Sequence, residues 1–129
     1  MDPRPTAERP GRLDVGVVGA GRVGSVLGAA LTLAGHTVVG ASGISAESRR
    51  QAETHLPGVP LLSPQEVVAR SSLALLTVPD DALPDLVGGL AATGVDVSGT
   101  LLVHTSGRYG YGVLDPATRA GALPLALHP

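Results

Sequence analysis

The sequence predicts an α/β fold, a doubly wound parallel sheet of about six strands with helices on both faces. The first observation is that apolar runs of strand length alternate with segments of helical periodicity from residue 13 onward. The second is that these runs are nearly continuous, which is typical of strands that helices cover on both faces. The third is size, because 129 residues with 43% hydrophobic content suit one globular domain with one core.

The first predicted unit is a strand, a glycine turn and a helix. Residues 13–18 form the strand, G-A-G-R-V-G follows at residues 19–24, and apolar residues then recur with helical spacing. Gly19 is expected to allow a sharp turn, Gly21 to let a pyrophosphate approach the backbone, and Gly24 to bring the helix close to the strand. The phosphates would lie at the helix N-terminus. The alternative is a tight turn with a purely structural purpose.

The remaining elements follow from their end signals. Gly35 ends the first helix as a C-terminal cap, Ser45 can cap the second, and S-P-Q-E at residues 63–66 is a capping box with proline at the first helical position. Strands are expected at residues 13–18, 37–41, 59–62, 73–78, 100–104 and 123–127. Helices are expected at residues 22–34, 46–55, 64–70, 83–91 and 111–120.

The composition excludes several classes of function. A net charge of −2 and only two aromatic residues give no electrostatic footprint or stacking platform for nucleic acid. Without cysteine there is no disulfide, thiolate nucleophile or cysteine zinc site, and the scattered histidines do not suggest a metal site. Residues 1–12 are polar and proline-rich and are expected to form a flexible arm before the domain at residues 13–129. No apolar segment suggests a signal peptide or a membrane span, so we expect a cytoplasmic protein.

A dinucleotide would contact the glycine turn and the ends of the second and fourth expected strands. An acid commonly follows the second strand where the cofactor is NAD, but here the stretch is S-G-I-S at residues 42–45. The small residues of this stretch leave room for a 2′-phosphate, and Arg49 and Arg50 lie one turn into the next helix, so NADP is favoured over NAD. The alternative is that Ser45 is only a helix cap and Arg49 part of a solvated face. The expected cofactor-binding residues are Gly19, Ala20, Gly21, Arg22, Val23, Gly24, Ser42, Ser45, Arg49, Val78 and Pro79.

The candidate catalytic residues are His104, Ser106 and His128. The sequence H-T-S-G ends the fifth expected strand, where its hydrogen-bonding groups would meet a substrate carbonyl or carboxylate beside a nicotinamide. The alternative is that His104 satisfies a loop carbonyl while the two hydroxyls cap the next turn. After the fourth strand, Asp80 or Asp81 is expected to cap the following helix rather than to act in catalysis.

These motifs together are familiar. V-G-V-V-G-A-G-R-V-G, T-V-P-D-D, V-H-T-S-G and the terminal A-L-H-P resemble the Rossmann-like NADP oxidoreductases of the 6-phosphogluconate dehydrogenase-like superfamily. The resemblance spans residues 13–129 and implies a cofactor on the glycine turn and a substrate region near Ser106 and His128. Relatives often carry Ser-Arg-Ser after the second strand, a motif that S-G-I-S replaces here. They also continue into a helical domain that closes the cleft, assists dimerisation and, in the wider superfamily, supplies a lysine for proton transfer.

The leading functional hypothesis is therefore the NADP-binding domain of an oxidoreductase that transfers hydride to or from a small carbonyl, imine or hydroxyl compound. One alternative is a non-catalytic dinucleotide-binding or sensor module. Another is the cofactor half of a pyrroline-carboxylate or ketopantoate type of reductase. We expect a small-molecule substrate, no nucleic-acid or membrane partner, and either a homo-oligomer or a separate helical domain. The chain alone is expected to bind cofactor with negligible turnover.

Overall fold

The structure, a computed structural model, describes residues 12–43 and 45–127. Five parallel strands form one sheet in the order β2-β1-β3-β4-β5. The strands are β1 (Asp14–Val18), β2 (Thr37–Ser42), β3 (Leu73–Leu76), β4 (Leu101–His104) and β5 (Leu123–Ala126). The helices are α1 (Arg22–Leu33), α2 (Ala46–His55), α3 (Pro64–Arg70), α4 (Leu83–Ala92) and α5 (Asp115–Thr118), with 3-10 turns η2 (Asp80–Ala82) and η3 (Tyr111–Leu114).

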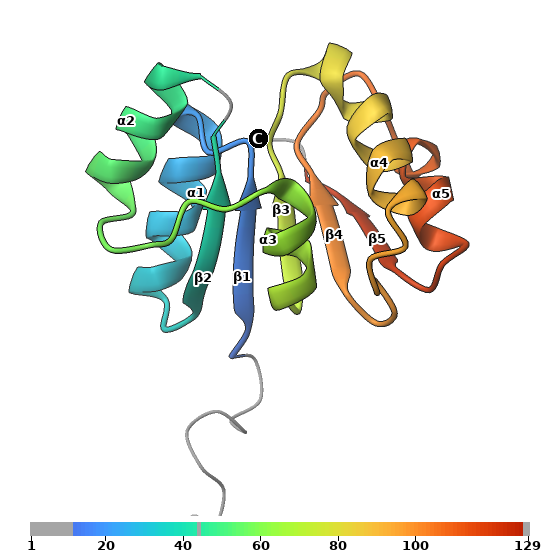
Figure 1. Ribbon diagram of the computed structural model, residues 1–129, viewed down its shortest axis with the longest axis horizontal. Helices are drawn as coiled ribbons and strands as arrows, with labels where there is room; N and C mark the ends of the chain where they lie inside the picture. Colours follow the sequence, from blue (N-terminus) through green and yellow to red (C-terminus); the bar gives the residue numbers. More distant parts are fainter. Residues whose placement is uncertain (1–11, 44, 128–129) are drawn as a thin grey trace, which may run out of the picture.

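Two apolar layers enclose the sheet and confirm the predicted doubly wound fold with helices on both faces. One layer packs α1 and α2 against β1 and β2 through side chains such as Val17, Val38 and Leu56. The other packs α3, α4 and α5 against β1, β3 and β4 through side chains such as Val67, Leu83 and Leu102. Figure 1 shows α1 and α2 at the β2 side of the sheet and α4 and α5 at the β5 side.

Local end signals determine where the helices begin and end. The Ser63 hydroxyl accepts a hydrogen bond from the Glu66 amide, and the Glu66 carboxylate accepts one from the Ser63 amide, so the predicted capping box is confirmed. The Ser45 hydroxyl accepts from the Ser48 amide and caps α2, also as predicted. After α1, Gly35 has φ +99°, the left-handed conformation expected of a C-terminal glycine.

The strand predicted at residues 59–62 does not join the sheet as a strand. This segment runs beside β2 with a single bridge between Ala41 and Leu61, closed by one hydrogen bond on each side. Pro60 accepts a hydrogen bond from the Ala41 amide but has no N–H of its own, so the ladder cannot extend along the segment. The sheet therefore has five strands where the sequence predicts about six.

The predicted aspartate cap before α4 is wrong. Asp80 and Asp81 lie inside the 3-10 turn η2, and neither η2 nor α4 has a side-chain cap. The Ala82 amide donates to the Pro79 carbonyl at 2.9 Å, and the Leu83 amide donates to the Asp80 carbonyl. The amides at the start of α4 therefore donate to backbone carbonyls of the tight turn, and not to an aspartate side chain.

Part of the sheet carries exposed apolar side chains. One face of the sheet is covered by α1 at β1 and β2. At the other end of this face, β5 presents Leu123 and Leu125 beside their register partners Leu101 and Val103. Leu123 and Leu125 are 50% and 45% exposed. The apolar residues Val23, Val26 and Leu33 of α1 are exposed as well. No helix in the described part of the chain is long and apolar enough to cross a membrane.

Candidate functional site

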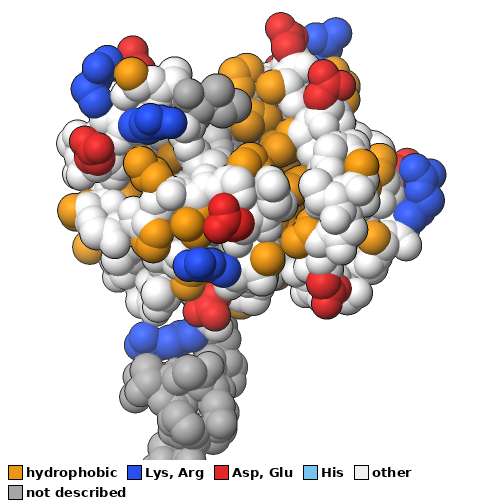
Figure 2. Space-filling view, viewed as in Figure 1, with side chains coloured by type: hydrophobic (Ala, Val, Ile, Leu, Met, Phe, Trp, Pro, Cys, Tyr) orange, Lys and Arg blue, Asp and Glu red, His pale blue; other side chains and the backbone are white. Residues whose placement is uncertain are grey.

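A cleft of about 610 Å³ lies beyond the carboxyl ends of β1, β2, β3 and β4. It includes the point between β1 and β3 where the order of the strands across the sheet reverses. Ligands of doubly wound sheets bind at such a switch point. Figure 2 shows apolar side chains gathered in the hollow at the top of the view, between the α2 and α4 sides. The lining residues are Gly19, Gly21, Arg22, Val23, Ser45, Ser48, Thr77, Val78, Pro79, Asp80, Ala82 and Thr105.

The fold itself explains two of the three motif glycines. Gly19 has φ +84°, which L side chains rarely adopt, and a Cβ there would lie 2.7 Å from the Val78 side chain. A Cβ on Gly24 would lie 2.8 Å from Val17 Cγ1 and 2.9 Å from the Gly19 carbonyl oxygen, and would collide with the Thr77 hydroxyl. The predicted sharp turn at Gly19 and the close packing at Gly24 are both confirmed.

Neither sterics nor backbone conformation explains Gly21. Its φ is −76°, which any residue can adopt, and a Cβ there would meet no protein atom within 4 Å. The space beside Gly21 is the cleft itself. A glycine at this position therefore keeps part of the cleft free rather than allowing the chain to fold.

The N-terminus of α1 opens into the same space. Gly21 is the N-cap of this 12-residue helix, no side chain caps the helix, and its first turn contains no acidic residue. The first amides of a helix have no partner within the helix, and the helix dipole adds positive potential there. An anionic group seated over Gly21 would meet both features.

Two polar side chains that line or underlie the cleft hold the glycine turn in place. Ser42 is buried, and both its hydroxyl and its carbonyl accept from the Gly19 amide, at 3.2 and 3.1 Å. The Thr77 hydroxyl donates to the Gly19 carbonyl at 2.8 Å. Ser42 is expected from the sequence to lie at the cofactor. The supporting role of Thr77 is not, because it becomes visible only where Gly24 packs against the end of β3.

At the β2 end of the cleft, the structure separates the residues that the sequence groups together. Ser45 lines the cleft, and Ser48, which sequence analysis does not single out, lines it beside Ser45. Arg49 instead lines a separate depression, together with Gly43, Glu53 and residues of the 61–66 segment. The predicted contact between Arg49 and a 2′-phosphate stays a prediction. Ala20 and Gly24 are buried beneath the turn, while Val78 and Pro79 line the cleft as expected.

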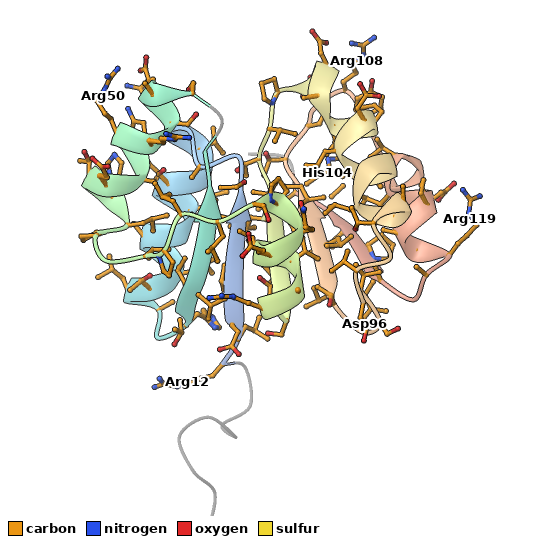
Figure 3. The ribbon with its side chains drawn as sticks, in the orientation of Figure 1. Arg12, Arg50, Asp96, His104, Arg108 and Arg119 are labelled. Carbon is orange, nitrogen blue, oxygen red and sulfur yellow. The ribbon has the colours of Figure 1, made fainter. Side chains whose placement is uncertain are left out.

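At the β4 end, His104 lies inside the fold. Its side chain is 0% exposed, its Nε2 lies 2.8 Å from the Gly110 carbonyl oxygen, and its Nδ1 accepts from the Ser106 amide at 3.1 Å. Figure 3 shows His104 within the molecule and Arg108 at the surface. Ser106 is also buried, and its hydroxyl accepts from the Arg108 amide. The geometry agrees with the alternative in which His104 satisfies a loop carbonyl.

Of the three candidate catalytic residues, His104 and Ser106 are buried and do not line the cleft. The third, His128, lies outside the described residues. The residue that reaches the cleft from this loop is Thr105. Among the described lining residues, only Arg22 and Asp80 are ionisable. The arrangement can therefore hold an extended anionic ligand, with hydroxyl groups at both ends of the cleft and an apolar wall formed by Val23, Val78 and Ala82.

Comparison with solved structures returns the same fold. A 3-hydroxyisobutyrate dehydrogenase from Mycobacterium tuberculosis, solved with L-serine, is 23% identical with a TM-score of 0.73, over 91% of this chain and 40% of that one. A variant of an imine reductase from Myxococcus stipitatus with NAD⁺ is 22% identical with a TM-score of 0.70, over 89% and 40%. The imine reductase of the same organism with NADP⁺ is 23% identical with a TM-score of 0.66, over 88% and 39%.

This chain thus spans about 40% of the length of these three proteins. At 22 to 23% identity, what it shares with them is the fold. No curated protein matches the sequence significantly. The family model for the Rossmann-like domain matches residues 1–129, the whole chain. The chain therefore belongs to the Rossmann-like domain family.

Proposed function

We propose that the cleft binds a nicotinamide dinucleotide, with its pyrophosphate over Gly21 and the N-terminus of α1. The observation that carries this proposal is the glycine at position 21, which neither backbone conformation nor protein packing requires and which keeps space open at an uncapped helix end. A Cβ would fill the cradle that a pyrophosphate needs, so the residues present fit the cofactor. The nucleosides would extend toward Ser45 and Ser48 at one end and toward Thr105 at the other.

The decisive variant is Gly21→Ser. A serine N-cap usually stabilises a helix relative to glycine, and its hydroxyl would accept from the same first-turn amides that the pyrophosphate would use. We expect the variant to melt no lower than the wild type, while NADP⁺ binding weakens about tenfold or more, because hydrogen bonds to charged groups contribute about 1.5 to 3 kcal/mol each. Isothermal titration calorimetry measures the affinity without a fluorescent residue.

Gly88→Ser is the matched control, because Gly88 is an exposed glycine of α4 whose Cβ would also meet no protein atom within 4 Å, and it lies outside the cleft lining. This control should bind NADP⁺ as the wild type does. A Gly21→Ser protein that binds within about twofold of the wild type would refute the proposed pyrophosphate position, since one lost charged hydrogen bond already exceeds that change.

We propose NADP(H) as the preferred form of the cofactor. The support is the chemistry of the β2 end of the cleft, where the lining residues are the hydroxyl side chains Ser45 and Ser48 and not a carboxylate. An acid at this end would bond the ribose hydroxyls of NAD and repel a 2′-phosphate. Parallel titrations with NADP⁺ and NAD⁺ test the preference, and equal or tighter binding of NAD⁺ would contradict it.

The activity we propose for the protein that contains this domain is hydride transfer to or from a small compound, in which the bound nicotinamide would supply hydride to a carbonyl or imine and accept it from a hydroxyl compound. One observation favours the second candidate, a module that binds the dinucleotide without turnover. The described lining offers Arg22 and Asp80 as its only ionisable side chains, whereas His104 is buried outside the lining with two backbone partners. Oxidation of NADPH by this chain with small 2-oxo acids and cyclic imines would support the enzyme, whereas binding without oxidation would support the module.

A further inference from the structure

The segment that follows β4 and runs into η3 has a composition that does not favour one conformation. Its sequence, S-G-R-Y-G-Y-G at residues 106–112, contains three glycines and the only two aromatic residues of the chain. None of these glycines has a positive φ, and a Cβ on any of them would meet no protein atom within 4 Å. Neither a special backbone conformation nor close packing therefore explains them, and a glycine-rich loop loses much conformational freedom when it becomes ordered.

The His104 ring contacts the backbone of this segment at two points, Ser106 and Gly110. The Ser106 amide donates to Nδ1 at 3.1 Å, and the Gly110 carbonyl lies 2.8 Å from Nε2. The backbone of β4 holds the histidine in turn, since the Leu127 amide donates to the His104 carbonyl at 2.8 Å and His104 is in register with Leu76 of β3. We call the two ring contacts the His104 clasp.

The partners determine the protonation state of the ring. An amide N–H can only donate, so Nδ1 must offer a lone pair, and a carbonyl oxygen can only accept, so Nε2 must carry the proton. The ring is therefore neutral, with one tautomer fixed by two backbone groups. A ring in this state has no free nitrogen with which to exchange a proton with a ligand in the cleft.

We propose that His104 is a positioning residue, whose clasp on residues 106–110 determines where Thr105 stands in the dinucleotide cleft. Thr105 lies between the clasping histidine and the first clasped amide, and it is the residue of this loop that lines the cleft. The inference rests on the proposed function, because it assigns Thr105 to the nicotinamide half of the ligand. The other half extends toward β2, at the opposite end of the cleft.

Nitrogen-15 NMR of the histidine side chains tests the clasp without any ligand. We expect the His104 signals of a neutral ring protonated at Nε2, assigned by their loss in His104→Gln, and slow exchange of the Ser106 amide proton. A proton on Nδ1, or a doubly protonated ring at neutral pH, would overturn the clasp. This result does not depend on whether the protein binds a dinucleotide.

Two conservative variants then separate the two contacts. His104→Asn keeps an acceptor near the Nδ1 position for the Ser106 amide, and His104→Gln keeps a donor near the Nε2 position for the Gly110 carbonyl. Because the Ser106 contact adjoins Thr105, we expect His104→Gln to weaken NADP⁺ binding about 3- to 10-fold, and His104→Asn to change it by less than about twofold. ADP, which lacks the nicotinamide nucleoside, should bind both variants as it binds the wild type.

His55→Gln is the control, since His55 ends α2 and lies outside the cleft lining, and melting curves of all three variants report folding. Equal losses of ADP and NADP⁺ affinity in His104→Gln would mean that His104 only supports the fold, and unchanged NADP⁺ affinity would mean that the clasp does not position Thr105. Either result would overturn the proposal. If the wild-type protein bound neither ligand, both the proposed function and the role of His104 toward a ligand would be contradicted. The nitrogen signals would still decide whether the clasp exists.

Discussion

Gly24→Ala is expected to destabilise the domain, although alanine is the better helix former. The new Cβ would stand 2.8 Å from Val17 Cγ1 and 2.9 Å from the Gly19 carbonyl oxygen, and closer still to the Thr77 hydroxyl. Two of these groups belong to backbone or to the sheet core, so α1 must move away from β1. Overpacking of this kind costs about 1 to 3 kcal/mol, whereas helix propensity returns at most about 1 kcal/mol. Because all three contacts would be shorter than 3.0 Å, the cost should fall in the upper half of that range, and we expect a net loss of about 1 to 2 kcal/mol.

Gly28→Ala is the matched control on the same helix. Its nearest new contact, at 3.0 Å, is Cδ2 of Leu56, the end of a flexible side chain that can rotate away, and Val17 Cγ2 lies 3.3 Å from the new Cβ. The same gain in helix propensity should offset the small cost of moving these side chains, so the free energy of unfolding should change by less than about 0.5 kcal/mol. The contrast between the two variants isolates the close approach of α1 to β1.

Far-UV circular dichroism measures both melts in a chain that has no tryptophan. The expected loss corresponds to a Tm about 3 to 10 °C lower for Gly24→Ala in a domain of this size. If Gly24→Ala melted at the wild-type temperature, or together with Gly28→Ala, then α1 would not need a glycine against the end of β3, and the packing argument would fail.

Three further predictions concern other parts of the molecule. The hydrogen bonds from Ser63 hold the pKa of the Glu66 carboxyl below its usual value. This carboxylate therefore adds stability above an unfolded pKa of about 4.3, and that stability is lost as the pH falls through the folded pKa. An NMR titration should find the pKa of Glu66 restored toward its usual value in Ser63→Ala, and an unchanged low pKa would contradict the capping box as its cause. If Arg49 reaches the 2′-phosphate, Arg49→Ala should lower the ratio of the NAD⁺ to the NADP⁺ dissociation constant toward one, while the neighbouring Arg50→Ala leaves this ratio unchanged. Equal ratios in the wild type and both variants would exclude Arg49 as the contact. The exposed Leu123 and Leu125 should make this chain self-associate, so Leu125→Glu should lower the mass measured by sedimentation without lowering the Tm, and a wild-type monomer at high concentration would refute this.

The order and type of the elements could be predicted because local signals agree with the global fold. The capping box at Ser63, the C-terminal glycine at position 35 and the glycine turn each occur where the structure begins or ends an element. The errors arose where a backbone group competes with a side chain. Pro60 interrupts a ladder that its neighbours would extend, and the 3-10 turn at Asp80 satisfies amides that the aspartate was expected to cap.

The site was predictable in location but not in detail. The ends of strands locate Gly21, Val78 and Pro79 at one edge, because carboxyl ends of parallel strands meet there. The direction of a side chain at such an edge depends on its neighbours instead. Thr105 and Ser106 are adjacent hydroxyl residues, yet the first lines the cleft and the second is buried and absent from the lining. Sequence spacing alone does not separate them.

The distinction that remains is between residues that the fold requires and residues that it merely permits. At Gly19 and Gly24 a larger side chain would strike the protein, so those glycines would be needed even in a domain that binds nothing. At Gly21 a side chain would strike only the cleft, at a helix end with no cap of its own. His104 presents the opposite case, because a residue type associated with chemistry has both nitrogens committed to the backbone. In this cleft, therefore, the missing side chain at Gly21 points to a ligand, because the fold does not require it. His104, the residue that first suggests catalysis, instead holds in place the loop that carries Thr105.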